Sequence, residues 1–294
     1  MSGSYHIGTQ EISAGPIEAG LYLVATPIGN LRDITLRALQ TIAAADIVAC
    51  EDTRVTRKLL DRYAISVRPV AYHEHNAAKA GPALIAALGE GKSVALVSDA
   101  GTPLVSDPGY RLVEQAIEAG IRVTPVPGAS APLAALVASG MPTDAFLFAG
   151  FLPNRKKARI DRLLELKSAP GTLVLFESPK RLSASLADCA ETLGGDRSAA
   201  VCRELTKTYE EVRRDSLDAL ARRYAETDNV RGEIVLVIGP PEAPEIPEVD
   251  VDELLRELGE SLAPGKAATE AARVTGLSLK SLYSRLLAMK GDGA

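Results

Sequence analysis

The sequence predicts an α/β protein with two sheet-containing domains followed by a small helical module. Three observations predict it: short aliphatic runs alternate with helical patterns from Gly20, a second alternation begins near Asp144, and a proline- and glutamate-rich segment precedes three short helical patterns. Strands that alternate with helices form βαβ units and a mainly parallel sheet. The 294 residues leave room for about two domains. The predicted divisions are 1–19 as a flexible lead-in, 20–143 and 144–239 as the two α/β domains, 240–250 as a linker, and 251–294 as a helix-turn-helix-like module.

The first predicted domain alternates buried strands with helices. Its aliphatic runs predict strands at 21–25, 46–50, 94–97 and 121–125, and helical composition fits 35–43, 53–63, 107–119 and 131–137. The third of these helices has a well-marked start, because Asp107 suits the N-cap and Pro108 the first helical position.

The second predicted domain is less regular. Strands are predicted at 146–149, 172–176, 199–203, 209–213 and 233–238, with helices at 154–167, 179–192 and 215–225. The close spacing of 199–203 and 209–213 predicts a β-hairpin, so this sheet is expected to be mixed. Beyond the linker, helical patterns lie near 251–260, 266–274 and 278–289.

The composition excludes several classes of function. The formal charge is −5, whereas non-specific nucleic-acid binders carry a broad basic surface, so any RNA contact must rest on local basic patches. With no Trp and 4% aromatic residues, the chain has few platforms for stacking a long single strand. The isolated cysteines predict neither a disulfide framework nor a zinc site. No apolar run approaches the roughly 18 residues of a membrane helix, and 1–19 lacks a signal-peptide pattern, so we expect a cytoplasmic protein.

Loops of small residues follow three of the predicted strands. Ser98–Pro103, Pro127–Ser130 and Thr26–Asp33 each connect a buried strand to a helix. In open parallel sheets, ligands bind outside the carboxyl ends of the strands, and glycine lets the backbone approach a ligand closely. We therefore expect these loops to line one cleft, although each alone is also typical of a turn that binds nothing.

Polar side chains near the same sheet edge are candidates for chemistry. Glu51–Arg54 places two adjacent acids and an arginine at the end of a strand, which suits a substrate pocket, but Asp52 or Thr53 would equally serve as a helix cap. His73–Asn76 contains a His-x-His spacing without a third ligand cluster, so no metal site is predicted. The usual dinucleotide, nucleoside-triphosphate and nucleophile-elbow fingerprints are absent from the sequence.

Two local basic runs occur in this acidic chain. Asn154–Arg162 carries five positive residues against one acid, and 264–290 carries Lys266, Arg273, Lys280, Arg285 and Lys290 against Glu270. Each run either contacts phosphates or is a solvated helix face.

The segment 265–283 resembles a helix-turn-helix. Gly276 would take the left-handed turn, Ser278 would cap the second helix, and Leu279 and Leu282 would face inward. A helical hairpin used for packing or dimerisation is the alternative.

Nine segments occur in a fixed order: Leu23–Ile34, Cys50–Arg54, Tyr72–Asn76, Ser98–Gly109, Pro127–Ala131, Phe148–Pro153, Phe176–Arg181, Arg203–Lys207 and Gly232–Glu233. In this order they resemble the tetrapyrrole methylase family, in its branch that methylates ribosomal RNA. The match covers about Gly20 to Gly239, and the C-terminal helices are similar as well. Thr102 stands where relatives that modify tetrapyrroles usually have Asp in a Gly-Asp-Pro loop, which favours the RNA branch.

The resemblance implies two α/β domains with S-adenosylmethionine in the cleft between them, and a homodimer. It also implies 2′-O-methylation of a cytidine ribose in the decoding region of small-subunit ribosomal RNA, with the 30S particle as the expected form of the substrate. The implied cofactor contacts are Pro27, Ser98, Asp99, Ala100, Gly101, Thr102, Val105, Ser130, Ala131, Phe176 and Glu177. The expected RNA contacts are Asn30, Arg32, Arg54, Asn76, Arg155, Lys156, Lys157, Arg159, Arg203, Lys280 and Arg285. The candidates for a base near the 2′-hydroxyl are Glu51, Asp52, Asp33 and His73, among which the sequence does not choose.

Two other functions remain open at this point. A methyltransferase acting on a small tetrapyrrole predicts a Gly-Asp-Pro loop and needs no basic C-terminal module, and the sequence disagrees on both counts. A ligand-sensing regulator would bind DNA through the helix-turn-helix. Truncation after Pro240 separates these functions: a small-molecule enzyme keeps its activity, a regulator loses DNA binding, and an RNA enzyme loses substrate affinity.

Overall fold

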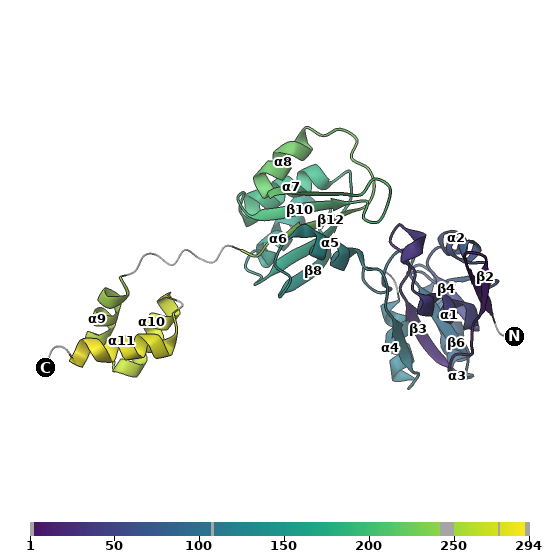
Figure 1. Cartoon of the computed structure of the whole chain (residues 1–294), viewed down its shortest axis with the longest axis horizontal. Coiled ribbons are helices and arrows are strands. Elements are labelled where there is room, and N and C mark those ends of the chain that lie inside the picture. The colour runs from purple at the N-terminus through teal and green to yellow at the C-terminus, as the bar shows by residue number, and fades with distance from the viewer. Residues whose placement is uncertain (1–2, 107–108, 242–249, 276, 292–294) are drawn as a thin grey trace. The chain divides into compact units, whose positions relative to one another are not determined.

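The computed structural model describes residues 3–106, 109–241, 250–275 and 277–291. Contacts along the chain divide it into two compact units, Met1–Pro241 and Glu242–Ala294, and each is described by itself. The first unit contains two five-stranded sheets with their covering helices, and the second is helical (Figure 1).

The first sheet is parallel throughout, as predicted. Its strand order is β5-β4-β6-β3-β7. Helices α1 and α2 cover one face, where Leu39 and Leu60 are buried, and α3 and α4 cover the other, around Leu84 and Leu112. Strands buried on both faces read as continuous aliphatic runs, which is why the sequence locates them well. The elements are β3 (Gly20–Val24), α1 (Leu36–Ala44), β4 (Ile47–Cys50), α2 (Thr53–Arg62), β5 (Val70–Ala71), α3 (Ala77–Gly89), β6 (Ser93–Val97), α4 (Tyr110–Glu118) and β7 (Val123–Val126).

The second sheet is mixed, and its predicted hairpin is present as β10–β11. The strand order is β11-β10-β12-β9-β8, and β8 and β9 run parallel. Along β9 the side chains alternate: Leu173 and Leu175 pack under α6, α7 and α8, whereas Val174 and Phe176 face α5. The elements are α5 (Ala131–Ser139), β8 (Phe146–Phe151), α6 (Lys156–Leu166), β9 (Thr172–Glu177), α7 (Leu182–Leu193), β10 (Ser198–Arg203), β11 (Glu211–Ser216), α8 (Leu217–Ala225) and β12 (Ile234–Ile238).

Helix α5 belongs to a different core from the one that the predicted division at 143 implies. Ala135 and Leu136 of α5 are buried together with Val174, Ala200 and Val237 of the second sheet. The helix is nearly all Ala, Leu and Val, so its composition does not indicate which sheet it covers. The preceding strand β7 remains in the first sheet, so the chain changes cores between Val126 and Ala131.

The prediction of a flexible lead-in over 1–19 is wrong for residues 4–13. These residues form the antiparallel pair β1 (Ser4–Ile7) and β2 (Gln10–Ser13). Tyr5 is buried in the core formed with α1 and α2, and the backbone N–H of His6 donates to the carbonyl of Tyr63 at 2.8 Å. The strands are too short and too polar to be visible as a periodic pattern.

Two helix starts also differ from expectation. Helix α4 begins at Tyr110 with Gly109 as its N-cap at φ 132°, while the predicted cap residues Asp107 and Pro108 lie outside the described residues. Helix α3 has no counterpart among the predicted elements. It contains Gly81 and Pro82, which normally end helices and so hide it.

The second unit consists of α9 (Val251–Ser261), α10 (Pro264–Thr275) and α11 (Leu279–Gly291). Leu255 of α9, Ala268 of α10 and Leu282 of α11 are buried in one small core. Leu282 thus faces inward as predicted, but Leu279 is half exposed, so the prediction for Leu279 is wrong. The predicted turn residue Gly276 lies outside the described residues. No helix in the described ranges is long and apolar enough to cross a membrane.

Candidate functional site

A largely apolar cavity of about 380 Å³ is lined by segments from both sheets of the first unit. The start of α5 contributes Ser130 to Pro132, and the end of β9 contributes Phe176 to Pro179. The loop after β6 contributes Ala100, Gly101, Thr102, Val105 and Ser106. β12 adds Ile234 and Val235. We call this space the apolar cavity.

The loops that the sequence singled out do meet at this cavity. Of the predicted cofactor residues, Ala100, Gly101, Thr102, Val105, Ser130, Ala131, Phe176 and Glu177 line it. Thr26 ties the loop after β3 to the loop after β6, because its hydroxyl donates to the carbonyl of Ser98 at 2.8 Å and its backbone pairs with Gly101. Gly101 has φ +84°, a left-handed conformation that favours glycine.

Three predicted cofactor residues do not line the apolar cavity. Pro27 is buried, and Ser98 uses its hydroxyl to hold the loop, exchanging hydrogen bonds with the N–H and carbonyl of Ala100 at 3.1 and 3.0 Å. Asp99 lines a neighbouring cavity instead.

A contact that was not predicted from the sequence joins residues next to Ile28 and Leu205, which line the apolar cavity. The N–H of Asn30 donates to the hydroxyl of Thr206 at 3.0 Å, and Gly29 lies so close to Lys207 that a Cβ at position 29 would come within 2.5 Å of its Cγ. The ammonium of Lys207 is held by Glu204 at 2.8 Å and Glu233 at 3.0 Å. Both segments belong to the motifs that carry the family resemblance, but the sequence assigned Asn30 only to RNA and did not predict its contact with Thr206.

A second, more open cavity of about 990 Å³ lies at the carboxyl ends of β4, β5 and β6. We call it the polar cavity. Its wall carries Glu51, Asp52, His73 and Asp99, together with Arg54, Tyr110 and Arg111. Ser106 lines both cavities, so the two adjoin. Of the four predicted base candidates, Asp33 does not line either cavity.

The two aspartates of the polar cavity have different environments. Asp52 is the N-cap of α2 and accepts hydrogen bonds from the backbone and guanidinium of Arg54, which lower its pKa to about 2. Asp99 is more buried, and burial raises its pKa, although its Oδ1 accepts the N–H of Asp52 at 3.0 Å. A carboxylate with a raised pKa is the better proton acceptor, so the structure adds Asp99 to the base candidates and disfavours Asp52.

The loop from His73 to Asn76 is held by its own side chains. Asn76 accepts the N–H of His73 at 2.8 Å and donates to the carbonyl of Ala71 at 3.0 Å, so its amide, predicted to contact RNA, is used within the loop. The buried Nδ1 of His73 has no hydrogen-bond partner, and the His73 and His75 rings meet edge-on at 6.1 Å. Across the ranges that the structure describes, no group of three or more His, Cys, Asp or Glu is placed to hold a metal ion.

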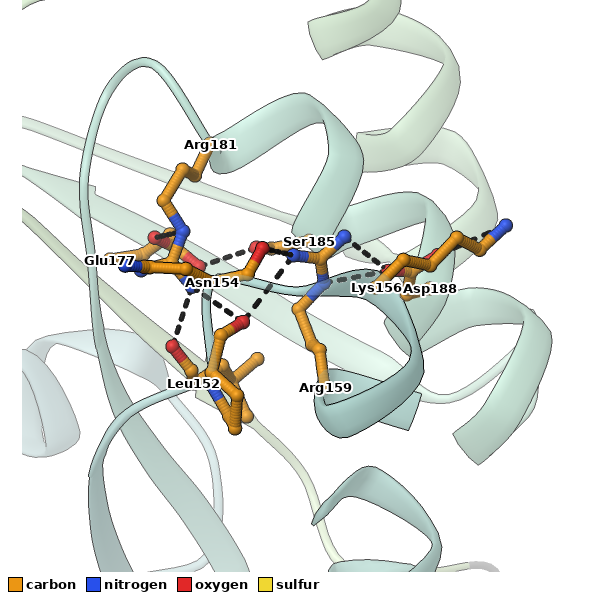
Figure 2. A network of polar contacts seen from close by, with 9 residues as sticks. Leu152, Asn154, Lys156, Arg159, Glu177, Arg181, Ser185 and Asp188 are labelled. Atoms are coloured by element: carbon orange, nitrogen blue, oxygen red, sulfur yellow. Dashed lines mark hydrogen bonds and ion pairs between the residues drawn. The ribbon is translucent and has the colours of Figure 1, made fainter. Parts of the chain in front are cut away.

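The basic run at 155–162 divides into exposed and buried members. Arg155, Lys156 and Lys157 are exposed, whereas Arg159 is only 5% exposed and forms an ion pair with Asp188 at 2.5 Å (Figure 2). The prediction that Arg159 contacts RNA is therefore wrong, because its guanidinium is already paired inside the protein and also donates to the carbonyl of Asn154 at 3.2 Å.

A second arginine fixes the loop that leads into this run. Arg181 donates to the carbonyl of Leu152 at 2.6 Å, beside the buried Glu177, whose carboxylate accepts hydrogen bonds from Ser178 and Ser185 (Figure 2). Glu177 therefore lines the apolar cavity with its oxygens already occupied by protein donors. The network holds the loop before α6 against β9 and α7.

The remaining predicted RNA contacts are mostly engaged in local structure. Asn30 caps the short 3-10 helix η1 (Leu31–Asp33) by accepting the N–H of Arg32, whose side chain is exposed. Arg203 pairs with Glu211 at 3.2 Å, and Arg285 forms a bidentate pair with Asp252 at 2.6 and 2.8 Å. Lys280 is exposed on α11.

The sequence is similar to known protein families in both units. The family "Tetrapyrrole (Corrin/Porphyrin) Methylases" matches residues 20–221, and the "RsmI C-terminal HTH domain" matches 245–290. Proteins named "Ribosomal RNA small subunit methyltransferase I" are 62% identical in Mesorhizobium japonicum, over 98% of this chain and 99% of the relative, and 44% identical in Escherichia coli O157:H7, over 96% and 99%.

Solved structures share the fold at low sequence identity. Diphthine synthase superposes with a TM-score of 0.59 at 17% identity, covering 74% of this chain and 89% of the other. A uroporphyrin-III C-methyltransferase from Thermus thermophilus, solved in complex with S-adenosylhomocysteine, superposes with a TM-score of 0.52 at 20% identity, covering 75% and 97%. At these identities the likeness concerns the fold alone.

Proposed function

This chain belongs to the tetrapyrrole methylase family and, within it, to the group of ribosomal RNA small subunit methyltransferase I, and from this membership we propose that it transfers a methyl group from S-adenosylmethionine to a cytidine 2′-hydroxyl in the decoding region of small-subunit ribosomal RNA. The observation that carries the proposal is the pair of adjoining cavities, one apolar and one polar, that share Ser106. A two-substrate transfer needs such adjacent sites, since the reacting atoms must be brought into contact.

The apolar cavity suits S-adenosylmethionine in size and lining. Its volume of about 380 Å³ falls within the roughly 300–1,000 Å³ typical of small-molecule sites. Its wall is mainly apolar, with Ile28, Val105 and Phe176 beside a few polar groups such as Thr102 and Ser130. The bound cofactor supplies a methyl group made electrophilic by a positively charged sulfur.

The polar cavity suits the nucleotide that receives the methyl group. We assign Asp99 as the group that takes the proton of the 2′-hydroxyl, because it combines a place in this cavity with a raised pKa and directly precedes Ala100 in the wall of the apolar cavity. Arg54 and Arg111 supply positive charge for a phosphate. In the reaction the ribose oxygen forms a bond to the methyl carbon, the carbon–sulfur bond breaks, and the proton goes to Asp99.

The decisive experiment measures transfer of labelled methyl from S-adenosylmethionine to 30S subunits that lack the modification, followed by nucleoside analysis. We expect labelled 2′-O-methylcytidine. Cofactor binding without incorporation into 30S subunits or free rRNA would overturn the RNA assignment and favour a small tetrapyrrole substrate.

The role of Asp99 is tested by Asp99→Asn, with Asp52→Asn as the matched control. General-base catalysis typically contributes about 10²–10⁴-fold, so Asp99→Asn should lower kcat by that factor while leaving cofactor affinity intact. Because the pKa of Asp99 is raised, the acidic limb of the wild-type pH profile should lie above the usual range of aspartate. If both variants lose the same factor in kcat, or if the acidic limb of the wild-type pH profile lies in the usual range of aspartate, Asp99 is not the base. Glu51 and His73 would then be the candidates again.

The remaining parts of the proposal concern assembly and the C-terminal unit. We propose a homodimer, supported by the exposed apolar side chains of Leu133 and Val137 on α5, and light scattering of the purified protein tests it. We also propose that the helical unit adds RNA affinity. Truncation after Pro240 should then raise the KM for 30S subunits and spare cofactor binding. Unchanged KM would assign the unit another task, and sequence-specific DNA binding by the full chain would favour a regulator.

A further inference from the structure

Helix α2 carries a basic face of which the functional assignment uses only Arg54. The helix buries Thr56, Leu59 and Leu60 and exposes the opposite side. Four basic residues and one acid lie on this exposed side: Arg54, Arg57, Lys58, Arg62 and Asp61. Residues three and four apart share a helix face, so the face has a net charge of +3 in a chain whose formal charge is −5.

The basic face extends away from the polar cavity. Its first residue, Arg54, is part of the cavity wall. At the other end of α2, the hydroxyl of Tyr63 donates to the carbonyl of Leu31 at 2.7 Å, which brings the helix end to η1 and the exposed Arg32. From Arg54 to Arg62 the helix rises by eight steps of 1.5 Å, so the face is about 12 Å long. A surface of this length can meet several phosphates of one strand.

The cations of this face have few acidic neighbours. In the part of the chain that the structure describes, Arg57, Lys58 and Arg62 have no carboxylate within ion-pair distance, in contrast to Arg159 and Arg203. Arg54 pairs with Asp52, but its side chain is 88% exposed, and exposed pairs of this kind contribute little. Unpaired cations on one face repel one another, and this repulsion is relieved when an anion binds.

We propose that the basic face of α2 binds the phosphate backbone of the RNA strand next to the nucleotide held in the polar cavity. The inference rests on the proposed function, because it takes RNA to be the substrate. Backbone contacts position a nucleic acid without reading its sequence, so this face sets affinity and register while the cavity selects the reacting ribose.

The test is the double variant Arg57→Gln/Lys58→Gln, which removes two charges and leaves Arg54 and the cavity intact. We expect affinity for an rRNA fragment containing the target site to fall about ten-fold at fixed salt, and the slope of log affinity against log salt to fall by about 1.4, or about 0.7 for each lost phosphate contact. Cofactor affinity, and kcat at saturating RNA, should not change.

The matched control is Arg222→Gln/Arg223→Gln, which removes the same charge from exposed residues of α8 that line neither cavity. If both variants lose the same affinity, the effect is one of net charge and the proposal fails. If Arg57→Gln/Lys58→Gln binds the fragment normally but methylates 30S subunits poorly, the face contacts a ribosomal protein and the RNA proposal is again refuted. Failure of the wild-type protein to methylate any RNA would instead overturn the proposed function.

Discussion

The buried ion pair between Arg159 and Asp188 should behave as a strongly coupled unit in stability measurements. Their side chains are 6% and 5% exposed, and two guanidinium nitrogens lie within 2.6 Å of Asp188 Oδ2. Removing one partner of such a pair leaves a buried charge, at a cost of about 3–5 kcal/mol. Replacing Asp188 should cost more unfolding free energy than replacing Arg159, because Lys156 lies 3.7 Å from Asp188 and can partly compensate for the loss of Arg159. No second carboxylate pairs with Arg159 within the described ranges.

We therefore expect Asp188→Leu to lose about 4–5 kcal/mol and Arg159→Met about 3 kcal/mol. The double variant leaves no unpaired charge, so its loss should be only about 1–2 kcal/mol, from the hydrogen bonds of Arg159 to Pro153 and Asn154. Urea unfolding followed by circular dichroism measures all four proteins, with the m-value as a check that the transition is unchanged. Additive losses in the double variant, or a loss below about 1 kcal/mol for Asp188→Leu, would refute the reasoning.

Three further predictions follow from the site. Gly101→Ala should weaken cofactor binding measured by calorimetry, because Gly101 has φ +84° and a Cβ there would lie 3.2 Å from Ile28. The control Gly91→Ala carries the same backbone strain, at φ +82°, but has nothing within 4 Å of the new Cβ, so its cofactor affinity should be unchanged. The stability that Asp52 contributes is present above its unfolded pKa and is lost as pH falls toward its folded pKa of about 2. Because its pair with Arg54 is exposed, this contribution is small, so Asp52→Asn should shift acid unfolding only slightly, and a large shift of the acid-unfolding curve would contradict the exposed pairing. Cys202 in the apolar cavity is buried, and burial raises its pKa to about 11. Its thiol should therefore react with a disulfide reagent at neutral pH only after denaturation. Rapid labelling of Cys202 in the native protein would show the cavity to be open.

The fold was predicted well where the hydrophobic pattern alone decides it. The strands of the first sheet are buried on both faces and appear as aliphatic runs, and the hairpin of the second sheet follows from spacing. Helix α5 was placed in the wrong core because an Ala- and Leu-rich helix fits either sheet, and only tertiary packing of Leu136 against Val174 and Val237 settles the choice.

The site was predicted in its loops and less well in its individual side chains. Glycine and small residues marked the loops at the strand ends, and these loops do converge on one cavity. The fate of a charged side chain depends on distant partners: Asp188 lies 29 residues from Arg159 in sequence, and nothing local shows that the two pair. The assignment of Asp99 to the polar cavity likewise depends on where β4 and β6 lie in the sheet, because its carboxylate accepts the N–H of Asp52, 47 residues away.

The crossing of the chain from one core to the other between β7 and α5 has a thermodynamic consequence. The apolar cavity exists only while both cores are folded, because its wall draws on the β6 loop from the first and on β9, β12 and α5 from the second. A ligand that binds there therefore opposes the unfolding of either half, by about 2.7 kcal/mol at a hundred times its Kd. With the cofactor bound there as proposed, the two halves should unfold together in one cooperative transition at a higher temperature.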